Sequence, residues 1–190
     1  MSFGNIVLKV LGWKVDNRIG ELPPKAVVIA APHTSMWDFV YGYYSYRAMG
    51  LRVKFLIKKE SFFFPMGIWL RYLGGIPVDR FSKNTIINDV VDAFNNTDRM
   101  ILTITPEGTR AKVKRWKSGY HRIAEAAKVP VIIGFIDYKT KTAGLIKIYD
   151  LQGDSNYDTL EIMKYYTEFE GKHNENFYLP EEAYHKKEAN

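Results

Sequence analysis

Apolar runs alternate with helical patterns along most of the chain, which predicts a layered α/β fold. The apolar runs have the length of buried strands, and the segments between them repeat their apolar positions at helical spacing. We therefore expect one domain over residues 1–190, with a mixed, mostly parallel sheet flanked by helices. The expected strands are 26–31, 53–57, 76–78, 100–104, 130–136 and 145–149. The expected helices are 36–49, 61–73, 84–95, 118–128, 157–171 and 181–187.

A short amphipathic helix is predicted over residues 3–13, within the N-terminal segment 1–13. Its apolar positions recur at helical spacing, with polar residues and a glycine on the opposite side. The apolar face either docks on the domain or rests in a membrane interface, and the pattern leaves both open. The apolar positions are Phe3, Ile6, Val7, Val10 and Leu11.

Composition limits the function classes only in part. The chain has 190 residues, 46% of them hydrophobic, which is enough for one packed domain. It contains no cysteine, so disulfides, thiolate metal sites and a cysteine nucleophile are excluded. The net charge of +6 suits nucleic acid, anionic lipid or a phosphorylated small molecule equally well. No segment approaches the roughly 20 apolar residues that a membrane-spanning helix needs.

The first candidate for chemistry is the stretch APHTSMWDF, residues 31–39. It follows an apolar run and precedes a helical pattern, so His33 lies at a strand-to-helix turn, where open α/β sheets bind ligands. In such a turn Asp38 can hold one imidazole nitrogen of His33 while the other nitrogen faces a substrate. Alternatively, Ser35 and Asp38 fit a capping box, which would explain the aspartate without catalysis.

A second candidate is TPEGTR, directly after the expected strand 100–104. The stretch combines hydrogen-bond donors, a carboxylate that accepts from hydroxyls, and a guanidinium whose planar fork fits a phosphate. This mixture suits a polyol phosphate, whereas the alternative is a Pro-Gly turn with solvated charges. The residues concerned are Thr105, Glu107, the Gly108 backbone, Thr109 and Arg110.

The third candidate is GGIPVDR, in which Gly74 and Gly75 allow a tight turn before a short strand. Arg80 ends this stretch. It is either a ligand-binding cation or a surface residue paired with Asp79.

Together with a fourth stretch, these segments resemble the glycerolipid acyltransferase family, which includes the 1-acyl-glycerol-3-phosphate acyltransferases. The resemblance covers residues 26–136 and rests on four blocks in the family's order. The blocks are HTSMWD (33–38), GIPVDR (75–80), PEGTR (106–110) and VPVII (129–133).

The resemblance implies a glycerol-3-phosphate acyltransferase-like fold and a role for each matching position. His33 would be the general base and Asp38 its orienting partner. The acceptor would be bound by Glu107, Gly108 and Thr109, and its phosphate by Arg80 and Arg110. The implied reaction moves a fatty acyl group from acyl-CoA or acyl carrier protein to a hydroxyl of a phosphate-bearing glycerolipid such as lysophosphatidic acid. It would need no cofactor and no metal.

The chain departs from the family pattern at three places. Pro32 stands where an asparagine is common, Thr105 stands where an aromatic residue is common, and the fourth block continues into IIG rather than a proline. These departures concern fine positioning and the choice of acyl chain.

Because no segment predicts a bilayer span, we expect a peripheral protein at the cytoplasmic, inner face of the membrane. The candidate contacts are the 3–13 helix, the apolar face of residues 62–69, and the basic run KVKRWK (112–117). A phenylalanine-rich stretch such as 62–69 more often packs in a core than on a membrane, so we expect it to be buried.

Three other interpretations remain. A non-catalytic lipid-binding protein could have the same fold, and a related transferase could use a different acceptor. The net charge and the KVKRWK run would suit a nucleic-acid-binding domain, but no binding motif is recognisable, so we expect no nucleic-acid partner.

His121 fits a surface position near Glu125, four residues later, better than it fits a second base.

Overall fold

The computed structural model of the chain describes residues 2–79 and 83–185, and all of its strands belong to one sheet. The strands lie in the order β1-β7-β6-β2-β5-β3-β4. Strands β2 to β6 are parallel where they pair, and β7 is antiparallel to β6. The bounds are β1 Lys14–Asn17, β2 Lys25–Ala31, β3 Val53–Lys58, β4 Gly75–Val78, β5 Met100–Ile104, β6 Val131–Asp137 and β7 Thr142–Tyr149. The predicted mixed, mostly parallel sheet is therefore confirmed.

The central strand β2 explains why its sequence is an uninterrupted apolar run. Successive side chains of a strand point to opposite faces of the sheet. Val27 and Ile29 accordingly enter the larger core cluster, whereas Ala26 and Val28 enter the second one. All four are fully buried, because helices cover the sheet on both faces.

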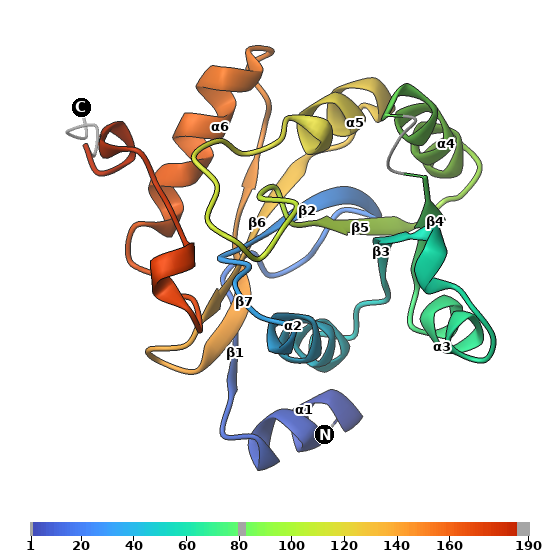
Figure 1. Cartoon of the computed structure of the whole chain (residues 1–190), viewed down its shortest axis with the longest axis horizontal. Coiled ribbons are helices and arrows are strands. Elements are labelled where there is room, and N and C mark those ends of the chain that lie inside the picture. Colours follow the sequence, from blue (N-terminus) through green and yellow to red (C-terminus); the bar gives the residue numbers. More distant parts are fainter. Residues whose placement is uncertain (1, 80–82, 186–190) are drawn as a thin grey trace.

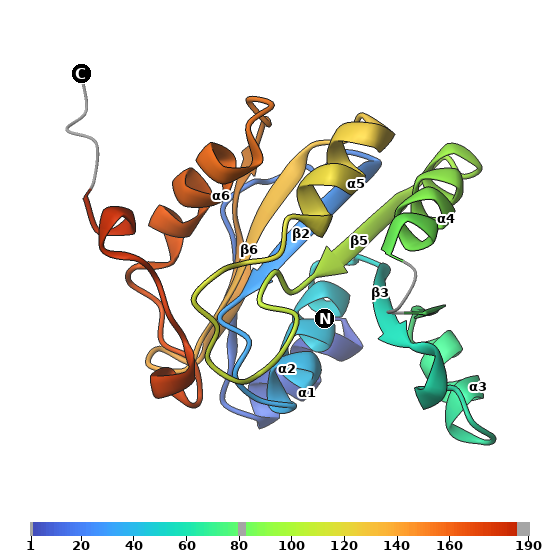
Figure 2. The same cartoon turned by 45° about the horizontal axis from the view of Figure 1, so that its top comes forward.

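Six helices and four short 3₁₀ turns accompany the sheet among the described residues. Figures 1 and 2 show α4, α5 and α6 on one face of the sheet and α1 with α2 on the other. None of the described helices is long and apolar enough to cross a membrane. The helices are α1 Phe3–Val10, α2 Trp37–Ala48, α3 Met66–Tyr72, α4 Lys83–Asn95, α5 Gly119–Ala127 and α6 Ser155–Met163, and the 3₁₀ turns are η1 Lys59–Ser61, η2 Lys164–Tyr166, η3 Asn174–Asn176 and η4 Glu181–Ala183.

Helix α1 docks on α2, but not through the face that the sequence pattern indicated. A Cβ atom at Gly4 would lie 2.5 Å from the Ala48 nitrogen, so the two helix backbones approach as closely as only glycine permits. Leu8 is buried on the same side. Much of the predicted apolar face stays exposed: Val10 is 82% exposed, and Phe3 is 69% exposed although its ring meets Tyr44 of α2 at 6.1 Å.

The expectation that residues 62–69 pack in the core is wrong. Helix α3 is short, and of its residues only Gly67 is buried, where it lies against the Phe62 backbone. Among the described residues no element covers its outer side. The exposed side chains are Phe63, Phe64, Met66, Ile68, Trp69 and Tyr72.

Candidate active site

The candidate catalytic groups meet at the carboxyl ends of β2 and β5. These two strands pair in parallel, with Ile29 opposite Ile104, so the segments that follow them leave the sheet at the same edge. The first segment leads into α2, and the second is the long connection between β5 and α5 (Figure 2). This register brings the HTSMWD and PEGTR segments together.

His33 and Asp38 form a hydrogen-bonded pair. His33 Nδ1 lies 3.1 Å from Asp38 Oδ2, and because an ionised carboxylate only accepts, the proton of this bond belongs to Nδ1. Nε2 then keeps its lone pair. The side chain of Asp38 is 3% exposed and that of His33 is 21% exposed, so the imidazole remains accessible while its partner does not.

Asp38 also stabilises the turn that carries His33. Its Oδ2 accepts hydrogen bonds from the backbone N–H groups of Thr34 and Ser35, each at 2.8 Å. The Ser35 hydroxyl in turn accepts from the Trp37 N–H at 3.2 Å. The capping interpretation and the histidine-pairing interpretation therefore both describe contacts that Asp38 makes.

Asp38 has a fourth partner that no sequence pattern indicated. The hydroxyl of Tyr138, which directly follows β6, donates to Asp38 Oδ1 at 2.6 Å. The two residues are 100 positions apart. Burial, and then the bond to the carboxylate, raise the pKa of Tyr138 well above its ordinary value, so the phenol remains a donor.

Glu107 lies behind His33. Its Oε1 accepts the His33 backbone N–H at 2.9 Å, and the residue is 4% exposed. Its Oε2 is buried and has no hydrogen-bond partner among the residues that the structure describes. Burial raises the pKa of Glu107 to about 7, against the lowering effect of the bond to His33. Glu107 therefore supports the turn of His33, and its contact with an acceptor stays a prediction.

An open cleft of about 570 Å³ adjoins this pair. Residues 34–36 form one wall, residues 109–111 with Thr109 and Arg110 form a second, and His173 and Asn176 complete the lining. The segment after α6 is held there by the His173 N–H, which donates to the Thr34 hydroxyl at 3.2 Å. Sequence reasoning missed this third wall because the segment has no motif.

Gly108 turns the chain between the buried Glu107 and the cleft. Its φ of +65° lies in the left-handed region that favours glycine. A Cβ atom there would lie 2.6 Å from Lys117 Nζ, so the lysine side chain lies directly against this turn. Arg80, the other predicted phosphate-binding residue, lies outside the described residues.

The expectation of a surface position for His121 is wrong. His121 is 2% exposed, and its Nε2 lies 2.8 Å from Asp158 Oδ2 in α6. Its contact with Glu125 is longer, at 4.0 Å. The local spacing of four residues pointed to the weaker partner, whereas the stronger one is 37 positions away.

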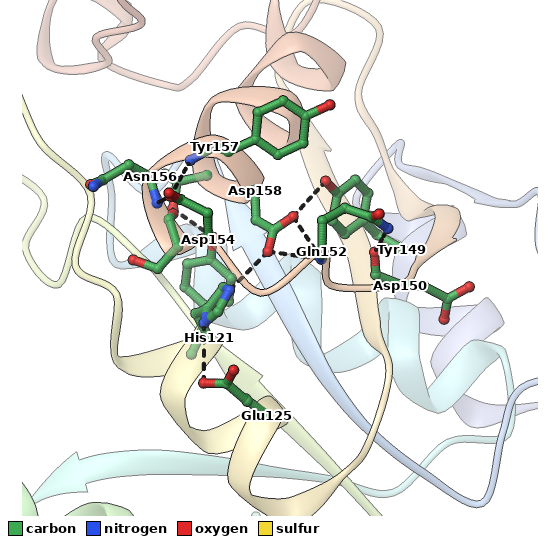
Figure 3. A network of polar contacts seen from close by, with 12 residues as sticks. His121, Glu125, Tyr149, Asp150, Gln152, Asp154, Asn156, Tyr157 and Asp158 are labelled. Carbon is green, nitrogen blue, oxygen red and sulfur yellow. Dashed lines mark hydrogen bonds and ion pairs between the residues drawn. The ribbon is translucent and has the colours of Figure 1, made fainter.

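Figure 3 shows Asp158 at the centre of this second network. Besides His121, it accepts from the Tyr149 hydroxyl at 2.9 Å and from the Gln152 N–H at 3.0 Å. With His121 and Asp158 both buried, no substrate reaches either side chain. The network ties α5, α6 and the end of β7 together, which makes it a structural element.

The sequence comparison decides the family. The profile of the Acyltransferase family matches residues 16–133, more than half of the chain. The chain belongs to the acyltransferase family. A comparison of this acyltransferase with curated protein sequences gives no match.

A solved structure with a similar fold is that of PlsC, the 1-acyl-sn-glycerophosphate (LPA) acyltransferase of Thermotoga maritima. The two structures superpose with a TM-score of 0.57 over 83% of this acyltransferase and 72% of PlsC, at 21% sequence identity. At this identity the likeness establishes the fold. The family match ends before Tyr138, His173 and Asn176, which belong to the part of the chain that it does not cover.

The raised pKa of Glu107 predicts a pH-dependent stability. An unfolded carboxyl titrates near pH 4.3, so between about pH 4.3 and 7 the folded state binds more protons. The contribution of Glu107 to the free energy of unfolding therefore falls as pH rises from about 4.3 to 7 and levels off above 7. Replacing Glu107 with Gln should remove this decline, worth about 2 to 3 kcal/mol between pH 4.5 and 8. Urea unfolding at both pH values measures it.

The matched control is Glu182→Gln, which removes an exposed carboxyl. It should leave the pH dependence of the wild type in place. A wild-type decline that persists undiminished in Glu107→Gln would contradict the assignment to Glu107.

Proposed function

We propose that this acyltransferase moves a fatty acyl group from a thioester donor to a hydroxyl of a phosphate-bearing glycerolipid such as lysophosphatidic acid. The donor is acyl-CoA or acyl carrier protein. The observation that carries the proposal is the His33 imidazole, which has one nitrogen bonded to a buried carboxylate beside an open cleft. A purely lipid-binding protein would have no use for that pairing.

The reaction follows from the free nitrogen of His33. Nε2 removes the proton of the acceptor hydroxyl, and the oxygen attacks the carbonyl carbon of the thioester. Asp38 stabilises the imidazolium that forms. The tetrahedral intermediate collapses, the C–S bond breaks, and the imidazolium returns its proton to the departing thiolate. The products are an ester and a free thiol, and neither a cofactor nor a metal takes part.

The cleft offers the polar groups that a phosphate-bearing acceptor needs. The planar guanidinium of Arg110 can bind a phosphate with two parallel hydrogen bonds, and the Thr109 hydroxyl lies in the same wall. A transferase for a different acyl acceptor is the second candidate, and the polar wall of His173 and Asn176 favours it, since those residues lie beyond the matched family segment.

Replacing His33 with Ala should abolish transfer, because a general base typically contributes about 10² to 10⁴-fold. The assay mixes the protein with labelled acyl-CoA or acyl carrier protein and a panel of acceptors, and resolves the products by mass. Asp38→Asn should also be slow, since a neutral amide caps the turn but does not stabilise an imidazolium.

His185→Ala is the control, because this histidine is exposed and is the last residue that the structure describes. Transfer by folded His33→Ala within a few-fold of the wild-type rate would exclude His33 as the base. Normal transfer by Asp38→Asn would show that Asp38 caps the turn and has no part in catalysis.

Replacing Arg110 with Ala should raise the KM for a phosphate-bearing acceptor by about tenfold or more and leave the KM for acyl-CoA almost unchanged. The KM for a neutral alcohol acceptor should rise much less. Arg99→Ala is the matched control, because Arg99 lies at the opposite end of β5. Equal increases in both KM values would show that Arg110 does not distinguish the acceptor.

We also propose that the protein works as a peripheral protein on the inner face of a membrane. Two exposed apolar surfaces support this, namely the outer side of α3 and the outward face of α1. Contiguous exposed apolar side chains on a folded domain mark interaction surfaces. The net charge of +6 favours anionic lipid, at about 1 kcal/mol for each well-placed Lys or Arg.

The double variant Phe64→Ser and Trp69→Ser should weaken binding to anionic vesicles by roughly tenfold or more without lowering the melting temperature. Both side chains are exposed, so the fold does not depend on them. Val10→Ser tests the face of α1 in the same way. Co-sedimentation measures binding, and Tyr184→Ser, at an exposed aromatic elsewhere, is the control. Unchanged co-sedimentation of the double variant would eliminate α3 as the contact.

A further inference from the structure

We propose that Tyr138 is a positioning residue for catalysis, which holds the carboxylate of Asp38 in the orientation that His33 requires. The proposal rests on the proposed function of His33 as the base. It assigns a role to a side chain outside the matched family segment.

The two oxygens of Asp38 have different partners. Oδ2 receives three hydrogen bonds, from His33 Nδ1 and from the N–H groups of Thr34 and Ser35. Oδ1 receives its bond from the Tyr138 hydroxyl, which at 2.6 Å is the shortest of the four. Without Tyr138, a buried carboxylate oxygen would lose its partner, and rotation about χ2 could exchange the two oxygens at His33.

Tyr138 is itself fixed by contacts from three parts of the chain. Its N–H donates to the Glu170 carbonyl at 2.9 Å. Its ring meets Trp13 edge to face at 5.0 Å and Tyr41 at 5.9 Å, while Trp13 and Tyr41 stack at 4.0 Å. The hydroxyl therefore reaches Asp38 from a ring that Trp13 and Tyr41 contact.

The bond also affects the charge that Asp38 presents to His33. A donor on Oδ1 withdraws part of the negative charge from the carboxylate, which weakens its stabilisation of a protonated imidazole. Tyr138 thus holds the carboxylate in place and also sets the charge that it presents to the imidazole. These two effects make separate predictions.

The test replaces Tyr138 with Phe, which keeps the ring and removes only the hydroxyl. With acyl-CoA and lysophosphatidic acid as substrates, kcat should fall about tenfold while both KM values stay within about twofold, since a bond to a charged group is lost. The acid limb of the pH–rate profile should move to higher pH. Tyr41→Phe, which removes a hydroxyl from the same aromatic group, should do neither.

A double-mutant cycle separates positioning from general damage. In an Asp38→Ala background the carboxylate is absent, so Tyr138→Phe should cause no further loss of kcat. If the hydroxyl matters only for stability, the two losses will multiply, and the proposal is overturned. A wild-type kcat and pH profile in Tyr138→Phe would overturn it equally.

One measurement does not depend on turnover. The chain has four histidines, so NMR titration can follow the His33 imidazole, with His33→Ala identifying its signal. The pKa of His33 should rise in Tyr138→Phe and stay unchanged in Tyr41→Phe. An unshifted titration would disprove the coupling even if acyl transfer is seen. A shifted titration in a protein that transfers no acyl group would refute the proposed function and leave the coupling established.

Discussion

The buried carboxylate of Asp38 is the constraint on which the candidate site depends. A charge removed from water must be matched by donors, and this one has four. Three come from the turn after β2, and the fourth comes from Tyr138 after β6. The requirement to satisfy one carboxylate therefore brings together the turn, the start of α2 and the end of β6. His33 is held in place because its Nδ1 is one of the four donors to this carboxylate.

The parallel register of the sheet supplies the second half of the site. Because β2 and β5 pair directly, Glu107 reaches the backbone of His33 from the neighbouring segment. Glu107 is buried, and its Oε2 has no partner within residues 2–79 and 83–185, an arrangement that costs stability and persists at functional sites. Strand pairing thus sets where the segments that carry His33 and Glu107 leave the sheet.

Local sequence patterns predicted the parts of the molecule that depend on local structure. All six expected strands are present, since buried parallel strands appear as apolar runs. Strand β1 was not predicted because it is short and half polar, and its place depends on its pairing with β7. The family resemblance located His33, Asp38, Glu107 and Arg110, and the structure brings the two segments that carry them to one edge of the sheet.

The errors share a physical cause. Tyr138 contacts Asp38 across 100 positions, and the network of Asp158 joins helices that are far apart in sequence, so neither leaves a local signal. The exposed side of α3 was misjudged because an apolar pattern does not show whether a neighbouring element covers it. Contacts between residues far apart in sequence, and the exposure of a helix face, become visible only in the folded chain.

The third wall of the cleft, formed by His173 and Asn176, is attached to the fold differently from His33 and Asp38. His33 and Asp38 follow directly on β2, and an insertion of one residue in that strand would shift its side chains to the other face of the sheet. His173 and Asn176 lie instead in a segment after α6, attached to the site by a hydrogen bond to Thr34. Substitutions there leave the sheet intact. Across evolution, the shape of the cleft can therefore diversify while His33 and Asp38 stay where they are.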